Sequence, residues 1–290
     1  FVPGPRTMLR RDDQLLVAGP SGALMSGGPD TPVVLVDDEL STGRSAVNAI
    51  RALQQCRSRR HFVLATLVDS RTPAQRDAVA AEVAALGAGV TSVSIYDGAF
   101  DAPRAVLHRA AALRARLANP APAPPLPARP IGEVCFASAT AMTADAGWSQ
   151  AAENAARLSA AGLARQLAVP GDARTLVLGD EEFMYLPQLI AAALGPAVRV
   201  SSTTRSPAVV IDTPGYALRT GLAFPSTSDP NRLAHAYNVA PSMHADAGNA
   251  PGFDHVVFVT DNALSRHVRD GLLAQLSTQA RCSVQVVAPC

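Results

Sequence analysis

A proline-rich segment constrains the fold of this 290-residue chain more than any other feature of its sequence. Residues 119–130 read NPAPAPPLPARP. Proline fixes φ and lacks an amide hydrogen, so this segment can join neither a helix interior nor the middle of a sheet. It predicts an extended linker between a domain at residues 1–118 and another at residues 131–290, each long enough to bury its own core.

The first domain alternates strand signals with helix signals. Continuous apolar and β-branched runs, typical of strands buried on both faces, predict strands at residues 32–38, 61–69 and 90–96. Helical patterns follow them at residues 43–56, 73–86 and 103–117. Right-handed crossovers between such strands give an α/β domain with a mainly parallel sheet flanked by helices.

The second domain shows the same alternation with less regularity. Strands are expected at residues 175–179, 197–202, 255–261 and 282–288, and two short antiparallel strands near 208–212 and 216–223. Helices are expected at residues 149–168, 181–194, 230–237 and 262–276. This domain is therefore also predicted to be α/β, with a mainly parallel sheet.

Charge and composition exclude several classes of protein. The formal net charge of +1 argues against a general nucleic-acid binder, and all 25 basic residues are arginine, which leaves no Schiff-base or Walker lysine. No apolar run reaches the length of a membrane span, and no signal peptide pattern opens the sequence. The cysteines lack a C-x-x-C spacing, which argues against a zinc site or a disulfide framework and favours a reducing cytoplasm; they are Cys56, Cys135, Cys282 and Cys290.

The motif that indicates chemistry is VVLVDDELSTGRS at residues 33–45. A predicted strand ends in Asp37 and Asp38, and a loop at residues 40–44 opens a helix. Ligands of open α/β sheets bind beyond the carboxyl ends of strands, where helix N–H groups suit a phosphate and carboxylates suit vicinal hydroxyls or Mg²⁺. The pattern predicts a ribose 5-phosphate site. The alternative is an ordinary capped helix, in which Asp38 and Ser41 only serve the turn.

The same string resembles the phosphoribosyl pyrophosphate signature of type I phosphoribosyltransferases, such as the orotate enzymes. The resemblance implies that Asp37 and Asp38 contact the ribose hydroxyls and hold Mg²⁺ through the substrate. The implied substrate-binding residues that follow them are Glu39, Leu40, Ser41, Thr42, Gly43, Arg44 and Ser45. The implied reaction transfers ribose 5-phosphate from phosphoribosyl pyrophosphate to a base-like acceptor.

The next predicted strand ends LVDSR, similar to the family strand near the base pocket. Asp69 and Arg71 are therefore expected to approach the acceptor, unless they form a solvated cap between strand and helix. Only 32 residues precede the first predicted strand, so the phosphoribosyltransferase-like domain is expected to be incomplete at its N-terminus. Residues 12–19 are expected to form the hairpin of the flexible loop, and the cations available to pyrophosphate are Arg6, Arg10 and Arg11, unless these arginines form an exposed basic loop.

Three motifs mark the second domain: GDEEFMYLP at residues 179–187, VRVSSTTRSP at 198–207 and TGLAFPS at 220–226. They resemble the TRSP domain, which accompanies a phosphoribosyltransferase domain in bacterial gene clusters linked to tellurium resistance and stress response. Arg205 lies among hydroxyl side chains and is expected to bind a phosphate or carboxylate. The same candidate site includes Glu182, Thr204 and Ser206. The alternatives are a salt bridge from Arg205 to Glu181 or Glu182, and a role for Glu182 as a first-turn helix acid.

The sequence thus favours a Mg²⁺-dependent cytoplasmic phosphoribosyltransferase that acts by positioning and electrostatics rather than through a protein nucleophile. Its expected partners are phosphoribosyl pyrophosphate and an unknown base-like acceptor, with neither nucleic acid nor membrane, and it is a candidate homodimer. Two alternatives stay open. One is a non-catalytic sugar-phosphate or nucleotide sensor or accessory protein, and the other is a scaffold for stress-response partners.

Overall fold

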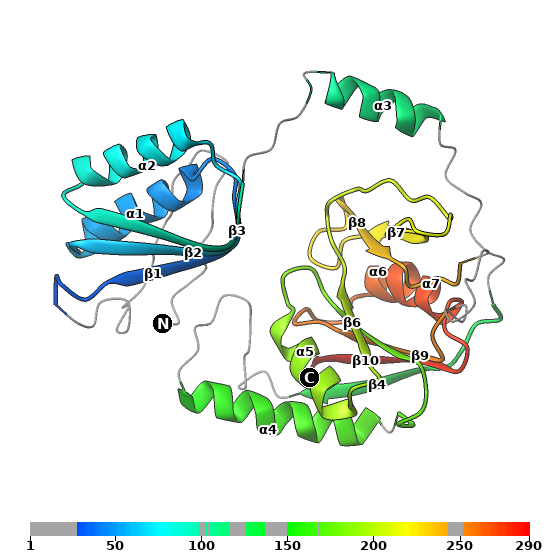
Figure 1. Ribbon diagram of the computed structural model, residues 1–290. Coiled ribbons are helices and arrows are strands. Elements are labelled where there is room, and N and C mark those ends of the chain that lie inside the picture. The colour runs from blue at the N-terminus through cyan, green and yellow to red at the C-terminus, as the bar shows by residue number, and fades with distance from the viewer. Residues whose placement is uncertain are drawn as a thin grey trace. The chain divides into compact units, whose positions relative to one another are not determined.

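The computed structural model describes residues 28–98, 103, 105–116, 126–136, 150–167, 169–242 and 252–290. The chain has two compact units that divide near Val106 (Figure 1). We call them unit 1 and unit 2 and describe each by itself. In the described part of the chain, no helix has the length and apolar character needed to cross a membrane.

Unit 1 is a three-stranded parallel sheet in the order β1-β2-β3. Its strands are β1 (Val33–Leu40), β2 (His61–Asp69) and β3 (Gly89–Asp97). The crossover helices are α1 (Arg44–Cys56) and α2 (Pro73–Ala85). The next helix in the chain, α3 (Val106–Arg116), belongs to unit 2 from Leu107 onward. This arrangement confirms the α/β class, and the strand and helix limits agree with the predicted ones within a few residues.

Local sequence signals explain where the helices of unit 1 begin and end. Thr72 and Gln75 form a reciprocal capping box at the start of α2, next to proline at the first helical position. Gly87, with φ of +78°, ends that helix. In α1, Ile50 and Leu53 are buried in the core against Phe62 and other residues of β2.

The opposite face of the unit 1 sheet differs from the prediction. The apolar runs predicted burial on both faces, but α1 and α2 cover one face only, as Figure 1 shows. Residues of the other face are exposed, with Val36 78% and Ile95 83% accessible. The prediction that both faces of this sheet are buried was therefore wrong for the described residues. A continuous apolar run shows that both faces of a strand are apolar, but it does not show which elements of the fold cover them.

Unit 2 is built on a five-stranded parallel sheet in the order β4-β10-β9-β5-β6. These strands are β4 (Ile131–Phe136), β5 (Thr175–Gly179), β6 (Arg199–Ser202), β9 (His255–Val259) and β10 (Ser283–Pro289). Its helices are α4 (Gln150–Leu167), α5 (Tyr185–Leu194), and a continuous helical stretch of α6 (Arg266–Val268), the π-helix η2 (Arg269–Leu273) and α7 (Ala274–Ser277). An antiparallel hairpin, β7 (Gly221–Pro225) and β8 (Leu233–Tyr237), completes the unit.

Several predicted elements of unit 2 are corrected by the structure. Residues 230–237 were expected to be helical, but they contain β8, in which Ala234 and Ala236 alternate into the core. The antiparallel partner of β8 is β7, whereas residues 208–212 are not a strand. The helix expected from residue 181 begins at Tyr185, because Glu181 has φ of +49° and the chain turns there. Strand β4 was not predicted.

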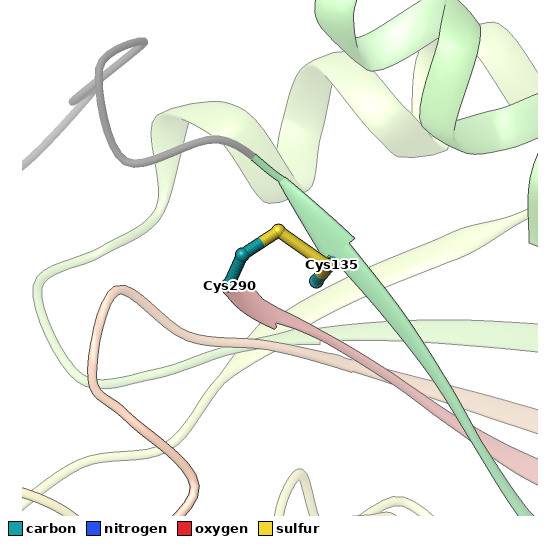
Figure 2. Close-up of a disulfide and its surroundings, with 2 residues drawn as sticks. All are labelled: Cys135 and Cys290. Carbon is teal, nitrogen blue, oxygen red and sulfur yellow. A yellow bond between two sulfur atoms is a disulfide. The ribbon is translucent and has the colours of Figure 1, made fainter.

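The cysteines also differ from the expectation. Cys135 of β4 and Cys290 beyond β10 form a disulfide, which Figure 2 shows, while Cys56 and Cys282 are exposed free thiols. The two bonded residues are 155 positions apart, and they meet because β4 and β10 are neighbouring parallel strands. Spacing along the sequence cannot reveal such a pair, which depends on strand order.

Candidate functional site

The acid pair, Asp37 and Asp38, lies at the carboxyl end of β1. The strand continues two residues further than predicted, because Glu39 and Leu40 still pair with Val68 and Asp69 of β2. The loop that joins β1 to α1 is therefore limited to residues 41–43, which we call the short loop. Leu40, expected to contact substrate, is instead a core residue with 4% of its surface exposed.

Both carboxylates of the acid pair are exposed to solvent. The backbone N–H of Asp38 donates a hydrogen bond of 3.0 Å to Oδ1 of Asp37. Partial burial raises the pKa of Asp37, and the neighbouring carboxylate of Asp38 adds to the increase. A cation or a pair of hydroxyl donors at this position would relieve both effects, since each stabilises the ionised carboxylates.

Glu39 has a different environment from the acid pair. The Ser70 hydroxyl donates to Oε1 of Glu39 at 3.0 Å. The carbonyl oxygen of Leu40, 3.1 Å from the same hydroxyl, is an alternative acceptor. These contacts join the ends of β1 and β2. Glu39, predicted to bind substrate, therefore has a partner within the protein.

The short loop presents polar groups at the N-terminus of α1. Ser41 and Thr42 are exposed, as are Arg44 and Ser45 in the first turn of the helix. Thr42 Oγ1 accepts a hydrogen bond from the N–H of Arg44 at 3.3 Å. The remaining N–H groups of a first helical turn have no acceptor within the helix, and together with the helix dipole they favour an anion.

Gly43 at the N-cap of α1 is required by both conformation and space. Its φ is +80°, a backbone conformation that residues other than glycine rarely adopt. A Cβ atom at this position would lie 2.7 Å from Cγ2 of Val79 and 3.3 Å from Cδ of Arg71. The backbone of the short loop thus packs directly onto α2 and onto the side chain of Arg71.

We expect Gly43→Ala to destabilise unit 1 more than Gly87→Ala does. Both glycines have positive φ, so each substitution costs about 1–2 kcal/mol for the left-handed backbone. Only Gly43 is also crowded, since nothing lies within 4 Å of a Cβ at Gly87. The clash adds about 1–3 kcal/mol, measurable as the difference between the two urea unfolding free energies. Equal losses would show that the short loop is not tightly packed.

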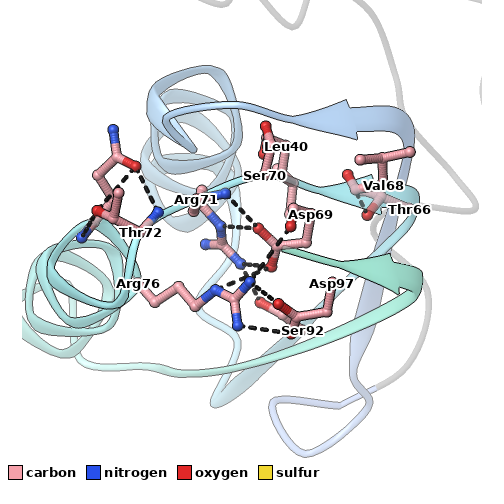
Figure 3. A network of polar contacts seen from close by, with 11 residues as sticks. Leu40, Thr66, Val68, Asp69, Ser70, Arg71, Thr72, Arg76, Ser92 and Asp97 are labelled. Carbon is pink, nitrogen blue, oxygen red and sulfur yellow. Dashed lines mark hydrogen bonds and ion pairs between the residues drawn. The ribbon is translucent and has the colours of Figure 1, made fainter. Parts of the chain in front are cut away.

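Asp69 and Arg71 form a buried ion pair beneath the short loop (Figure 3). Nε and Nη2 of Arg71 donate to the two oxygens of Asp69 at 2.9 and 2.7 Å, and Nη2 also donates to the Ser92 hydroxyl at 2.7 Å. Each residue of the pair is 2% exposed. The hydrogen bonds from Arg71 hold the pKa of Asp69 below its ordinary value.

Arg76 of α2 extends this pair to the surface. Its guanidinium bonds to both oxygens of Asp97, and its Nε lies 3.6 Å from Oδ2 of Asp69. Figure 3 shows the resulting cluster of two arginines and two aspartates at the ends of β2 and β3. Asp69 and Arg71 thus form neither of the expected arrangements: they are not a solvated cap, and burial keeps them from direct contact with an acceptor.

The arginines expected to meet pyrophosphate, Arg6, Arg10 and Arg11, lie outside the described residues, as does the hairpin expected at residues 12–19. The fit of Mg²⁺ is therefore judged on the acid pair alone. Among the described residues, no three His, Cys, Asp or Glu side chains are arranged to hold a metal ion. Two adjacent exposed carboxylates fit a hard cation that takes its remaining oxygen ligands from a substrate.

In unit 2, Arg205 pairs with glutamates. Its Nε lies 3.2 Å from Oε2 of Glu181 and its Nη2 3.9 Å from Oε1 of Glu182, which corresponds to the salt-bridge alternative. Glu182 is not a first-turn acid, because α5 begins at Tyr185 and has no acidic residue in its first turn. Thr204 pairs through its backbone with His235 of β8, and its hydroxyl accepts from the N–H of Ser206 at 3.1 Å.

A buried polar group next to Arg205 was not predicted. Asp180, 4% exposed, accepts hydrogen bonds from Thr227 and Thr260 at 2.6 Å each, from Asn262 at 3.2 Å and from Thr203 at 3.4 Å. We call these five residues the Asp180 cluster. Burial raises the pKa of Asp180 despite these donors. The sequence signal available was a polar residue directly after each strand end, at residues 180, 203 and 260.

Comparison with known families gives two matches along the chain. Residues 13–99 match the family described as phosphoribosyl transferase, and residues 142–276 match the family described as the TRSP domain C-terminal to it. The first match includes the acid pair, the short loop and the Asp69–Arg71 pair. The second includes Arg205 and the whole Asp180 cluster. No curated protein matches the chain.

Proposed function

This chain carries a phosphoribosyl transferase domain followed by a TRSP domain, and from that architecture we propose that it transfers ribose 5-phosphate from phosphoribosyl pyrophosphate to a base-like acceptor. The observation that carries the proposal is the exposed acid pair near the carboxyl end of β1, two residues before a short loop at a helix N-terminus. Carboxylates suit the ribose hydroxyls and helix N–H groups suit the 5-phosphate. The acid pair and the short loop therefore suit the sugar and the phosphate of one ribose 5-phosphate, respectively.

The proposed roles follow from the environment of each residue. Asp37 and Asp38 accept hydrogen bonds from the two ribose hydroxyls and, through the substrate, hold Mg²⁺. Ser41 and Thr42, with the N–H groups that open α1, bind the 5-phosphate. When bound, Mg²⁺ would supply charge neutralisation to the pyrophosphate. The chain itself contributes position and charge, so we assign no protein nucleophile.

The Asp69–Arg71 pair has a supporting role in this proposal. Arg71 lies against Gly43, where its Nη1 would be 3.5 Å from a Cβ atom. The Arg71 side chain packs against the backbone of the short loop and supports it. The hydrogen bonds from Arg71 to Asp69 keep this side chain from turning toward solvent. We therefore propose that the pair positions the 5-phosphate loop and does not contact the acceptor.

The proposal is tested with the double substitution Asp37→Asn and Asp38→Asn. We expect it to abolish Mg²⁺-dependent binding of phosphoribosyl pyrophosphate, because each charge-assisted hydrogen bond contributes about 1.5–3 kcal/mol. The fold should be kept, since both side chains are exposed. Binding is measured by calorimetry with phosphoribosyl pyrophosphate and Mg²⁺, and folding by thermal denaturation.

The matched control is Asp77→Asn with Glu82→Gln, which removes the same charge from exposed positions of α2. It should leave binding unchanged. Equal binding by the acid-pair variant and the parent would refute the assignment. A pyrophosphate-release assay then distinguishes the transferase from the alternative of a non-catalytic sensor, which predicts binding without release.

A further inference from the structure

We propose that the Cys135–Cys290 disulfide is a redox switch for the attachment of β4 and of the linker residues that precede it. A dithiol reduces the bond while unit 2 stays folded, and β4 then separates from β10. The proposal does not depend on phosphoribosyl transfer by unit 1. It is carried by the accessibility of the bond, by the shallow burial of β4 and by the contacts of residues 126–130.

The disulfide lies where a reductant can reach it (Figure 2). Cys135 is the next-to-last residue of β4, Cys290 directly follows β10, and both residues are exposed. Beside the bond, the N–H of Cys290 donates to the carbonyl oxygen of Phe136 at 3.1 Å. Thiol–disulfide exchange requires a thiolate to approach one sulfur atom, and exposed disulfides are the more labile ones. The bond can therefore react without prior unfolding of the sheet.

The other cysteine of unit 2 cannot supply the attacking thiol. Cys282 directly precedes β10, so it lies at the opposite end of that strand from Cys290. At roughly 3.3 Å per residue, the length of the strand separates the two residues by about 26 Å. The bond is therefore not exchanged within unit 2, and its reduction requires an external dithiol.

Reduction transfers two electrons and two protons from the dithiol to the protein. One thiolate of the dithiol attacks a sulfur of the bond, forms a mixed disulfide and releases one cysteine as a thiol. The second thiolate of the dithiol then displaces the other cysteine. The dithiol leaves as a disulfide, and Cys135 and Cys290 become two free thiols.

Strand β4 is weakly held apart from this bond. It lies at the edge of the described sheet, where it pairs with β10. Only Phe136 of its six residues is buried, whereas four of the five residues of β9 are. The ion pair of Glu133 with Arg269 adds little, because each side chain is 45% exposed. Without the disulfide, the attachment of β4 rests largely on its backbone hydrogen bonds to β10 and on Phe136.

The end of the proline-rich linker is fixed to unit 2 just before β4. The N–H groups of Leu126 and Arg129 donate to carbonyl oxygens at the end of α7, those of Thr278 and Ser277, at 2.9 and 3.0 Å. Nε of Arg129 is buried there and has no hydrogen-bond partner among the described residues, which costs free energy in the attached state. Residues 126–130 should therefore separate from unit 2 together with β4.

The intact disulfide opposes this separation. It keeps Cys135 beside Cys290, so β4 stays fixed at its carboxyl end and can re-form its hydrogen bonds to β10. The covalent link removes conformational freedom that the separated strand would otherwise gain. After reduction, residues 126–136 can leave the sheet as one segment. The free length of the linker then increases by these residues, so the redox state of the bond sets that length.

The test compares hydrogen exchange in the oxidised and reduced full chain, with Cys56→Ser and Cys282→Ser introduced so that no other thiol reacts. Dithiothreitol is the reductant, and alkylation by iodoacetamide with mass spectrometry counts the free thiols. We expect two thiols to appear well below the thermal transition of unit 2. On reduction, exchange in residues 126–136 should accelerate about 10-fold or more, while exchange in β5 and β9 changes less than about 3-fold. Reoxidation should restore the slow exchange.

Cys290→Ser should show the fast exchange of residues 126–136 with or without dithiothreitol, and Cys135→Ser replaces it if it does not fold. The matched control is the parent chain, which should respond to dithiothreitol as the variant lacking Cys56 and Cys282 does. The proposal is wrong if the oxidised chain still carries both thiols, or if they appear only as unit 2 unfolds. It is also wrong if residues 126–136 exchange equally in both states, or if β5 and β9 accelerate as much as β4.

Discussion

Asp69→Ala is expected to destabilise unit 1 by about 3–5 kcal/mol, because it leaves a buried arginine without its carboxylate. The Arg71 side chain is 1% exposed, and Asp69 accepts two of its hydrogen bonds. Removal of the carboxylate also withdraws the ion pair to Arg76 at 3.6 Å. Since Arg71 packs against Gly43, the short loop should loosen as well. The measurement is urea denaturation of the full chain, with hydrogen exchange to assign the lost protection to residues 41–45.

Asp97→Ala is the control for this result, because Asp97 bonds to Arg76 at the solvent-exposed end of the same cluster. Solvent screens that contact, and its loss should leave the unfolding midpoint close to that of the parent. Similar midpoints for Asp69→Ala and Asp97→Ala would contradict the interpretation of the buried pair.

The same pair predicts a pH dependence. Hydrogen bonds from Arg71 lower the pKa of Asp69 from its ordinary value of 3.8, so the folded state binds this proton less readily than the unfolded state. The resulting stability is fully present above pH 3.8 and is lost as the pH falls through the folded pKa. Asp69→Asn should remove this part of the acid dependence of unit 1 unfolding.

Asp180→Ala is expected to destabilise unit 2 by about 3 kcal/mol or more, because the donors of Thr227, Thr260 and Asn262 lose one shared acceptor. Asp180→Asn should cost much less. An amide oxygen can take the place of Oδ2 and accept from the same three donors. Burial raises the pKa of Asp180, so the folded state holds this proton more readily than the unfolded state does. The free energy of unfolding therefore falls as the pH rises through the folded pKa, and an uncharged asparagine avoids that loss.

Thermal denaturation of the two Asp180 variants at neutral pH measures this difference. Hydrogen exchange after β5 and β9 should increase in Asp180→Ala and stay near the parent level in Asp180→Asn. If both variants lose the same stability, the hydrogen-bond network around Asp180 does not have the role assigned to it.

The secondary structure of unit 1 could be predicted because its signals are local. The capping box at Thr72 and Gln75, Gly87 after α2 and the apolar runs of β1 and β2 all act within a few residues. The acid pair was predicted to end its strand, but β1 continues through Glu39 and Leu40, because both residues still pair with β2. The burial of Asp69 and Arg71 was not predictable, because two charged residues after a strand resemble a solvated cap unless the packing of Gly43 and α2 is known.

Unit 2 shows where local signals fail. The segment containing Ala234 and Ala236 has helix-forming composition, but both alanines fill a core beside β7, so tertiary packing decided its structure. The Asp180 cluster depends on β5 lying beside β9, and the bond from Thr260 to Asp180 spans 80 positions in the sequence. For Arg205 the sequence left open both an anion site and a salt bridge to Glu181 or Glu182, and the contact with Glu181 could not be chosen without knowing that β5 pairs with β6.

The strand order of unit 2 has a consequence for how the protein is made. Among the described strands of this unit, β4 is the first to leave the ribosome, and the one strand that pairs with it there is β10, the last. Cys135 precedes Cys290 by 155 positions, so at about 5–20 residues per second β4 waits roughly 8–30 s for its partner during synthesis. A chain that stops before Ser283 leaves β4 without a neighbour and turns β9 into an exposed edge. Premature termination near the C-terminus should therefore yield aggregating chains rather than slightly shortened folded ones.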